Sequence, residues 1–407
     1  MGFNTSLSGL RASNSDLNVT SNNIANSATT GFKESRAEFA DVFQGSAYGL
    51  SSNAVGTGVR VADVAQQFKQ GNIDTTGNVL DMAISGQGFF NVNHNGSNLY
   101  TRAGNFQVDA NGYVVTPEGY NLQVFPPDET GTAINTGSMK NLQLLTTDSS
   151  PKSTSTVNIG ATLPANATAP VTTPFNPTDT TSYNYSTSVS VYDSLGVSHV
   201  MSSYFVKTAN TNEWQQYTTI DGNSVSATPT TLQFSNAGVL TSPASGKIAL
   251  DGYTPSSGAG TLSVTLDLAG SSQYGESFSV NDLRQDGYAS GRLTEFEVQS
   301  TGQVYARYSN GANLLMGQVA LTNFNNEQGL QPQGNNCWGA SAAAGTPRTG
   351  APGSSDFGQV ESGSLEASTV DLTEQLVNMI VAQRNFQANA KMITTQDEIT
   401  QTVINIR

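Results

Sequence analysis

The sequence is poor in charged, aromatic and sulfur-bearing side chains. Of its 407 residues, 12% are charged and 8% are aromatic, and there is a single cysteine. One cysteine cannot form an intramolecular disulfide. Two histidines and one cysteine, far apart in the chain, also argue against a His/Cys metal site. We therefore expect no disulfide, no metal and no cofactor.

Basic residues and long apolar runs are scarce as well. The 17 Lys and Arg residues are unclustered and the net charge is −14, which argues against nucleic-acid binding. No run of about 18 apolar residues is present, so no membrane span is predicted. The first residues lack the basic start and apolar centre of a secretory signal. If the protein leaves the cell, we expect export without a cleaved signal peptide.

What the sequence does contain is glycine, serine, threonine and asparagine. Its 40 glycines include several Asn-Gly pairs, which are typical of tight turns between strands. Short alternating segments such as 186–192, 199–207 and 214–220 are separated by turn residues. The middle of the chain is therefore predicted to be mainly β.

The last forty residues, 368–407, lack this alternating pattern, and they predict one long helix. They contain no Gly and no Pro, and Ser368 with Asp371 forms a capping pattern at the start. An apolar stripe at alternating spacings of four and three predicts a coiled-coil contact, and Ile380 widens it. The stripe consists of Leu372, Leu376, Met379, Gln383, Phe386, Ala390, Ile393, Asp397, Thr400 and Ile404.

A second helix is predicted over residues 3–25, with the same spacing along one side. Its stripe consists of Phe3, Leu7, Leu10, Asn14, Leu17, Ser21 and Ile24. These two stripes are called the predicted seam below. An intramolecular helical hairpin is the simplest explanation for such a pair. However, helices of roughly 33 Å and 57 Å differ too much in length to cover each other, so we expect neighbouring molecules to supply the remaining contacts.

The order of helical and β segments predicts a nested, multi-domain architecture. Residues 1–26 and 368–407 form a helical coiled-coil domain, and residues 27–70 and 336–367 connect it to the β part. Residues 71–145 and 287–335 form an inner β domain, into which a second, outer β domain of residues 146–286 is inserted. The predicted fold is therefore mainly β with paired terminal helices.

No motif in the chain predicts catalysis. His94 and His199 lie outside any nucleophile motif and are interpreted as surface or strand-edge histidines. Gly86-Gln87-Gly88 lacks the third glycine and the helix of a dinucleotide site, and predicts a tight turn between strands. Asp109-Ala110-Asn111-Gly112 lacks the distal Glu of a calcium loop and predicts a hairpin turn. We expect the protein not to be an enzyme.

Three separated segments, in order, carry a family resemblance. Residues 21–33 (SNNIANSATTGFK), the β segments 86–90 (GQGFF) and 100–106 (YTRAGNF), and residues 370–391 resemble signatures of the bacterial flagellar axial proteins, which are rod, hook and hook-associated subunits. Length and the inserted segment make the chain most similar to the hook subunits. Residues 188–196 and Glu366-Ala367-Ser368 add to this similarity.

The resemblance implies a structural subunit that polymerises into a short curved tube joining rod to filament and transmits torque as a universal joint. It implies export through the flagellar apparatus to a hook outside the cell surface. The implied partners are further copies of the chain and the neighbouring axial proteins of the rod, hook cap and hook–filament junction. Another axial subunit (distal rod or hook-associated protein), a β-rich extracellular adhesin and a polysaccharide-acting enzyme remain as alternatives.

Overall fold

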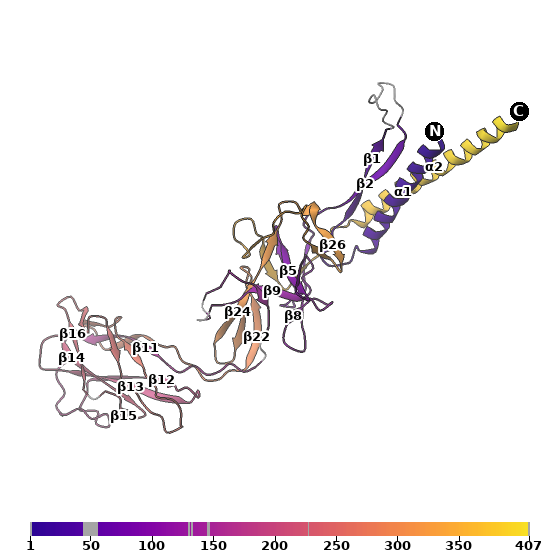
Figure 1. Ribbon diagram of the computed structural model, residues 1–407. Helices are drawn as coiled ribbons and strands as arrows, with labels where there is room; N and C mark the ends of the chain where they lie inside the picture. Colours follow the sequence, from indigo (N-terminus) through magenta and orange to yellow (C-terminus); the bar gives the residue numbers. More distant parts are fainter. Residues whose placement is uncertain are drawn as a thin grey trace. The chain divides into compact units, whose positions relative to one another are not determined.

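The computed structural model describes residues 2–43, 56–128, 131, 133–144, 147–226 and 228–405. The chain forms two compact units (Figure 1). Unit 1 comprises Met1–Leu145, Phe296–Ala306 and Leu314–Arg407, and unit 2 comprises Thr146–Glu295 and Arg307–Asn313. Each unit is therefore assembled from segments that are distant in the sequence.

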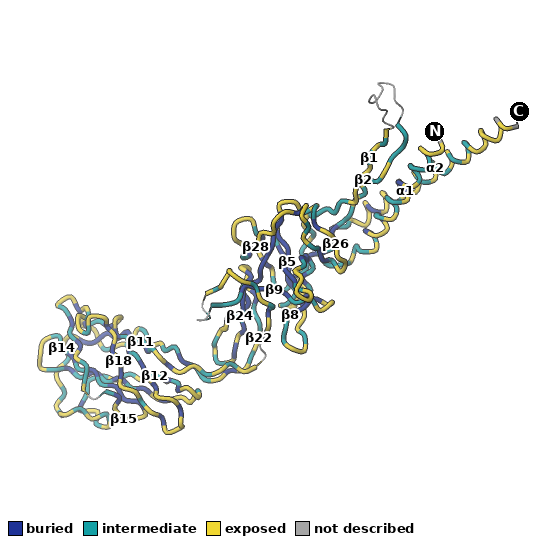
Figure 2. The backbone as a smooth tube through the Cα atoms, viewed as in Figure 1, coloured by how far each residue is buried: buried dark blue, intermediate teal, exposed yellow. Residues whose placement is uncertain are grey.

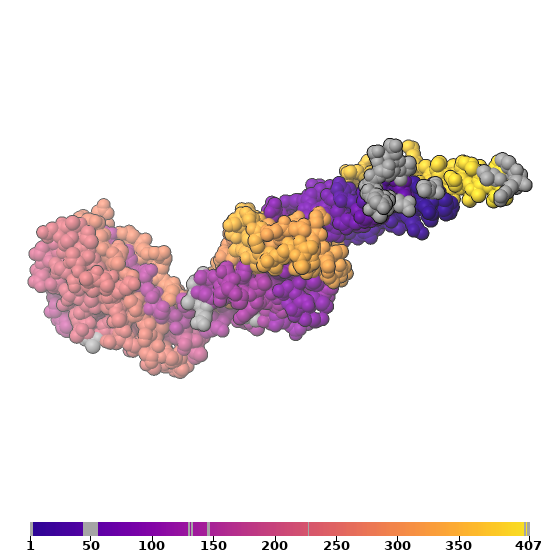
Figure 3. Space-filling view, turned by 45° about the horizontal axis from the view of Figure 1, so that its top comes forward, coloured from indigo at the N-terminus to yellow at the C-terminus, as the bar shows by residue number. Residues whose placement is uncertain are grey.

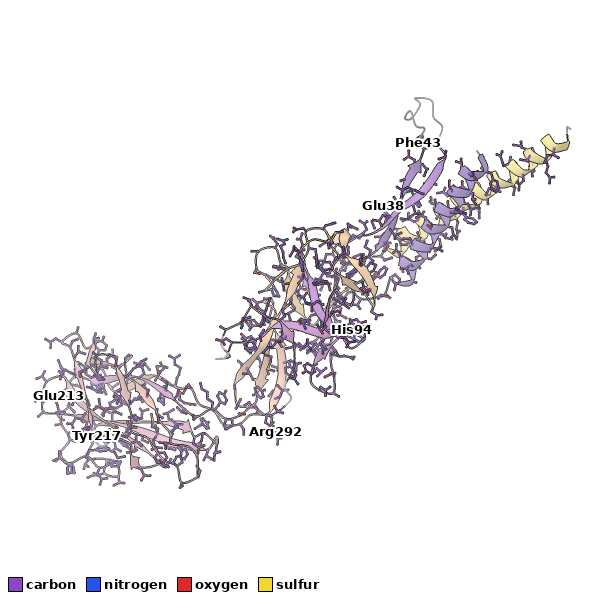
Figure 4. All side chains as sticks on the ribbon, viewed as in Figure 1. Glu38, Phe43, His94, Glu213, Tyr217 and Arg292 are labelled. Carbon is purple, nitrogen blue, oxygen red and sulfur yellow. The ribbon has the colours of Figure 1, made fainter. Side chains whose placement is uncertain are left out.

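Unit 1 contains both terminal helices and a long hairpin. The helices are α1 (Gly2–Ala25) and α2 (Leu372–Asn405), and a short 3-10 helix spans Glu327–Gly329. The hairpin pairs β1 (Ser35–Val42) with β2 (Gly58–Gln66). Figure 4 labels Glu38 and Phe43 on this hairpin. The prediction of a mainly β chain with helical, paired ends is confirmed.

A large sheet forms the β part around which unit 1 is built. Its main path runs β22 (Leu293–Val298), β23 (Gln303–Tyr308), β24 (Asn313–Val319), β9 (Asn121–Phe125), β5 (Phe89–His94), β6 (Ser97–Thr101), β27 (Cys337–Gly339) and β26 (Gln331–Gly334). Shorter strands join this path at its sides: β7 (Gln107–Val108), β8 (Val114–Val115), β10 (Lys140–Asn141), β25 (Leu321–Asn323) and β28 (Arg348–Gly350). Two small antiparallel pairs complete the unit: β4 (Met82–Ser85) with β29 (Gln359–Ser362), and β3 (Ile73–Thr75) with β30 (Ser364–Glu366).

Hydrophobic residues from both halves of the chain form the core of unit 1. Phe90, Leu122 and Leu321 are fully buried in one cluster, while Phe89 and Trp338 pack edge to face in another, with ring centroids 5.7 Å apart. In Figure 2 the central strands β5 and β9 are dark blue, the colour of buried residues. Residues 336–367, which the sequence assigns to a connector, contain β27, β28, β29 and β30, each paired with a strand of the first half or of the sheet.

Unit 2 is built from two further sheets. The first orders β12 (Tyr185–Tyr192), β13 (Ser198–Lys207), β14 (Glu213–Ile220), β16 (Thr230–Phe234) and β17 (Leu240–Ser242), with β15 (Asn223–Ser224) beside β14. The second orders β18 (Lys247–Ala249), β19 (Thr265–Asp267), β11 (Thr156–Pro164) and β20 (Ser272–Tyr274), with β21 (Ser279–Gln285) on β11. The predicted strands 186–192, 199–207 and 214–220 correspond to β12, β13 and β14.

Alternation along these strands explains the core of unit 2. Along β13 every second residue is buried, so Met201 and Phe205 point inward while Val200 points outward. Fully buried Trp214 and Leu232, paired across β14 and β16, belong to the same core. A strand with one buried face has its register fixed, because a slip of one residue would expose its whole apolar set.

A single carboxylate organises the point where β11 begins. Asp286 accepts hydrogen bonds from the backbone N–H groups of Ser155 (2.8 Å) and Thr156 (2.9 Å) and from the Ser155 hydroxyl (2.7 Å). Partial burial opposes ionisation, yet these bonds together with Lys152 lower the pKa of Asp286 to about 2. In the unfolded chain this carboxyl would titrate near 3.8.

This shift predicts acid sensitivity in unit 2. A folded pKa below the unfolded value gives stability that is present above pH 4 and is lost as the pH falls towards 2. Asp286→Asn should lower the free energy of unfolding of unit 2 by about 1 kcal/mol at pH 7, after allowance for its solvent exposure. Urea titrations should show a clearly smaller difference at pH 2.5 than at pH 7, because a carboxyl with a folded pKa of about 2 is still partly ionised at pH 2.5. An equal deficit at both values would contradict the assignment.

Candidate functional site: the paired terminal helices

Helix α2 begins later than the sequence predicts. The Asp371 carboxylate accepts the backbone N–H groups of Thr373 (2.8 Å) and Glu374 (3.2 Å), so Asp371 is the N-cap and Leu372 the first helical residue. The prediction that Ser368 starts the helix is wrong, because Ser368 accepts only the N–H of Val370, at 3.4 Å. The predicted helix end at Arg407 lies outside the described residues.

The two helices run antiparallel, and two contacts fix their register. Asn23 donates to the side chain of Gln375 at 3.1 Å. A Cβ added at Gly9 would lie 2.5 Å from Asn389 Oδ1, so the α1 backbone closely approaches α2 there. These contacts are 14 residues apart on both helices (9 to 23 and 375 to 389), and the register is therefore constant between them.

The stripe of α2 that faces α1 is not the predicted seam. Buried and half-buried residues recur at spacings of four and three from Gln375 onward: Gln375, Met379, Ala382, Phe386, Asn389, Ile393 and Gln396. Only Met379, Phe386 and Ile393 belong to both stripes. Ala390 is half-buried beside the contact, whereas the remaining predicted positions are exposed: Leu372, Leu376, Ile380, Gln383, Asp397, Thr400 and Ile404.

On α1, small and polar residues take the most buried positions. Ala12, Ser13, Thr20 and Asn23 are buried. Of the predicted seam, Leu7, Leu10, Leu17 and Ile24 are half-buried, and Phe3, Asn14 and Ser21 are exposed. Small residues allow close approach of the helices, and Asn23 supplies hydrogen bonds where a leucine would supply apolar area. The strongest apolar stripe in the sequence is therefore not the one used within the chain.

Because α1 covers a different stripe of α2, part of the apolar surface of α2 remains uncovered. Leu372, Leu376, Val377, Ile380 and Val381, called the α2 patch below, are each about half exposed, with 51% of Leu376 accessible. In Figure 2 this helix is mainly yellow and teal. Soluble monomers rarely leave such a contiguous apolar surface open to water, and its presence commonly marks a contact with another molecule.

Helix α2 also extends beyond its partner. Continuing the register by seven residues places Gly2, the first residue of α1, opposite Gln396. Residues 397–405 then have no α1 residue opposite them, over about 13 Å. Figures 1 and 3 show the yellow end of α2 continuing past the indigo α1. The predicted length mismatch is thus present and leaves Asp397, Thr400 and Ile404 without an intramolecular partner helix.

A buried ionic cluster joins the helices to the β part of unit 1. Lys33 Nζ lies 2.6 Å from Glu366 Oε1, and Arg102 NH1 lies 3.4 Å from Glu366 Oε2. Exposed fractions of these side chains are 1% for Lys33, 4% for Arg102 and 0% for Glu366. These three residues come from the end of the α1 segment, the middle of the sheet and the segment before α2, which are thereby held at one point.

Backbone groups add further hydrogen bonds to these charges. Lys33 donates to the carbonyl of Lys69 at 2.6 Å, Glu366 accepts from the N–H of Gly71 at 2.8 Å, and Arg102 donates to the carbonyl of Gly86 at 2.9 Å. Burial lowers the pKa values of Lys33 and Arg102, and the Glu366 carboxylate opposes both shifts. The guanidinium of Arg102 also lies over the Phe89 ring, 5.3 Å from its centroid.

This cluster was not predicted from the sequence, although each member lies in a segment that carries the family resemblance. Lys33 closes the first signature, Arg102 lies in the YTRAGNF segment and Glu366 precedes the last helix. The residue types alone did not indicate a buried ion pair, because a Lys, an Arg and a Glu far apart in the sequence are most often exposed. Their mutual contact depends on tertiary structure and could not be read from spacing.

The sequence motifs tested for catalysis have structural roles. Gly86 and Gly88 both have φ +116° and form the turn between β4 and β5, as predicted. Asp109 Oδ1 accepts the N–H groups of Asn111 and Tyr113, which makes 109–112 a hairpin turn. His94, labelled in Figure 4, is exposed at the end of β5, as predicted.

His199 differs from its prediction as a surface or edge residue, because it is buried. Its Nδ1 lies 2.6 Å from Asp221 Oδ2 and its Nε2 lies 3.3 Å from Asp193 Oδ2. Burial opposes protonation, but these two carboxylates raise the pKa of His199. Both ring nitrogens are engaged, and Ser257 donates to Asp193 at 2.9 Å rather than to the imidazole. This arrangement cross-links strands and leaves no nitrogen free to activate a serine.

Within the described part of the chain, no group of three or more His, Cys, Asp or Glu side chains is placed to hold a metal ion. Neither α1 nor α2 combines the length and the apolar character needed to cross a bilayer.

Removal of the central carboxylate should test the ionic cluster. Glu366→Gln removes the carboxylate that is paired directly with both buried cations, and we expect the free energy of unfolding of unit 1 to fall by about 3–5 kcal/mol, measured by urea denaturation. Glu38→Gln is the matched control, since the Arg36–Glu38 pair is exposed and should cost below about 1 kcal/mol. Similar losses in the two variants would refute a central role for Glu366.

Family models of flagellar proteins match four parts of the chain. Residues 3–33 match "Flagella basal body rod protein", and residues 83–170 match "Flagellar hook protein FlgE/F/G D1 domain". Residues 158–288 match "Flagellar basal body protein FlaE D2 domain", and residues 361–406 match "Flagellar basal body rod FlgEFG protein C-terminal". The ionic cluster draws one residue from each of three of these matches.

Relatives align over the full length. The chain is 41% identical to the flagellar hook protein FlgE of Escherichia coli strain K12 and 40% identical to that of Salmonella typhimurium, with 100% of both chains covered in each case. A crystal structure of the Helicobacter pylori flagellar hook protein FlgE2 shares the fold, with a TM-score of 0.56 and 17% identity over 72% of this chain and 100% of that one. The chain therefore belongs to the flagellar hook protein family.

Proposed function

We propose that this chain is the structural subunit of a bacterial flagellar hook and polymerises into a curved helical tube that couples rod to filament. The observation that carries the proposal is the apolar surface of α2 that α1 leaves uncovered, both in the α2 patch and in the projecting end. Full-length similarity to hook proteins supports the same function and favours it over the rod, hook-associated, adhesin and enzyme alternatives.

The self-assembly contacts are assigned to the predicted seam and the α2 patch. Apolar members of the seam that remain half or fully exposed, such as Leu10, Leu17 and Leu376, supply area for neighbouring copies. Asn14, Gln383 and Asp397 set the register between copies at some cost in stability, as polar residues within coiled-coil contacts do. Hydrophobic contacts of this kind are strong enough to hold a polymer without any ligand.

Torque has to pass from the helical part of the subunit to its β part. The Lys33–Glu366–Arg102 cluster supports this role, because it ties three crossing segments together in a water-excluded site. Breaking a buried, hydrogen-bonded ion pair is costly, so the junction resists local opening under load. The expected nested division, with a helical domain, connectors and two β domains, remains part of the proposal.

Bending needs contacts that can rearrange. The outward-facing residues of β12 and β13 include Ser186, Ser188 and Ser190, and Ser188 pairs with Ser202 at 2.9 Å between hydroxyl oxygens. A surface of small hydroxyl side chains makes weak, hydrated contacts that water can replace. Neighbouring copies can therefore slide over such surfaces while the helices keep the polymer intact.

The same family membership supports the finer part of the proposal, which is the location of the subunit and its partners. We assign the subunit to the hook outside the cell surface, reached through the flagellar export apparatus. Its partners are further copies of itself and the axial proteins of the rod, the hook cap and the hook–filament junction. No cofactor, nucleic acid or catalytic step is part of the proposal.

Electron microscopy of the concentrated protein tests the proposal directly. The full chain should form hollow tubes, while a fragment of residues 70–360, which lacks both helices, should not. Globular particles at every concentration of the full chain would overturn the proposed function.

A double substitution tests the α2 patch. Leu376→Asp with Ile380→Asp should raise the concentration needed for polymerisation at least about tenfold, because it places charges in an apolar contact. Both side chains are exposed in the monomer, so circular dichroism and urea unfolding should remain unchanged. Asn385→Asp, an exposed polar position on the same helix, is the control and should polymerise normally. Normal assembly of the double variant would remove the patch from the mechanism.

A further inference from the structure

A groove lies between α1 and the β1–β2 hairpin, on a side of α1 that does not face α2. Its volume is about 380 Å³. The Ser8 hydroxyl accepts a hydrogen bond from the N–H of Val59 at 3.2 Å and so links α1 to β2 at the groove. Leu7, Val59 and Val61 give the groove an apolar centre.

Two unpaired cations stand at this groove. Arg11 on α1 and Arg60 on β2 are both exposed, and neither forms an ion pair with any described residue. Basic residues are scarce in a chain with a net charge of −14, so two of them beside an apolar groove form a local exception. The groove therefore suits an occupant that combines an apolar side chain with a carboxylate.

The projecting end of α2 has this combination. Asp397 and Ile404 are seven residues apart, so they lie two turns apart on one side of the helix. The side chain of Ile404 is 65% exposed, and Asp397 pairs with no cation among the residues that the structure describes. Both belong to the predicted seam, and they follow Ile393, its last member that faces α1, by one turn and by three turns.

The chain cannot fill its own groove with this segment. Helix α2 packs on the side of α1 that carries Gly9 and Asn23, and it runs on past Gly2 in a straight course. Ser8, Arg11 and Ser15 lie on another side of α1, and a helix without Gly or Pro has no point at which to turn back. An occupant with this chemistry must therefore come from another molecule.

We propose that the α1–hairpin groove receives the projecting end of α2 from a second copy of the chain, with Ile404 in the apolar centre and Asp397 against Arg11 and Arg60. The proposal rests on the proposed self-assembly and names a specific contact within it. A groove of this volume accepts side chains rather than a whole helix, so the incoming helix lies along its rim. Opposite charges then select the register, as flanking charges do in coiled coils.

Charge reversal with a reciprocal swap tests the contact in the full chain. Asp397→Arg and Arg11→Asp should each raise the concentration needed for polymerisation about three- to tenfold, measured by sedimentation and electron microscopy at low ionic strength. The double variant, Asp397→Arg with Arg11→Asp, should return it towards the wild-type value. Arg60→Asp should behave like Arg11→Asp. Glu398→Lys is the matched control, since residue 398 points about 100° away from Asp397, and it should assemble normally.

Several outcomes separate this contact from the function itself. Normal assembly of both single reversals, no recovery in the double variant, or equal damage from Glu398→Lys would overturn the groove contact while wild-type tubes still form. Binding of added acidic peptides to the groove without any effect of the reversals on assembly would assign it to a different protein partner and also overturn the proposal. Absence of tubes from the wild-type chain would instead overturn the proposed function.

Discussion

The buried contact among Lys33, Arg102 and Glu366 is the constraint on which unit 1 depends. It is the place where the segment leaving α1, the sheet and the segment entering α2 meet, with 2.6 Å between the ammonium and the carboxylate. Charges taken out of water are tolerated only when paired and hydrogen-bonded, and here backbone groups of Lys69, Gly71 and Gly86 take part. This requirement makes the junction specific, because each of the three segments supplies one of the charges.

From that junction the two helices leave antiparallel, and their contact is more polar than a coiled coil of leucines would be. Asn23 exchanges hydrogen bonds with Ser35 and also donates to Gln375, which fixes the start of the pair. Met379, Phe386 and Ile393 face α1, but small and polar residues take the most buried positions, so Leu372, Leu376 and Ile380 of α2 remain on the outside. A monomer that is folded and yet carries unsatisfied apolar surface is suited to polymerisation, since association buries what folding leaves exposed.

Much of the β structure could be predicted from local pattern. Alternation and turn residues located β12, β13 and β14 to within a residue or two, because one buried face and a tight turn fix both period and ends. The capping residue of α2 was misplaced by three positions, since Ser368 and Asp371 are both good caps and only the course of the chain after Glu366 decides between them. His199 was misjudged because its partners, Asp193 and Asp221, come together only when β12, β13 and β14 pair.

The sequence by itself determined the fold class, the two terminal helices, their unequal lengths and the family, since periodicity, turn chemistry and signature segments are local properties. The tertiary structure decided which stripe of each helix is used within the chain, which apolar residues stay exposed and how three distant charges share one buried site. These features depend on which elements pack against each other. A stripe rich in leucine predicts that a helix needs a partner, but the partner's own surface determines which side of the helix it covers.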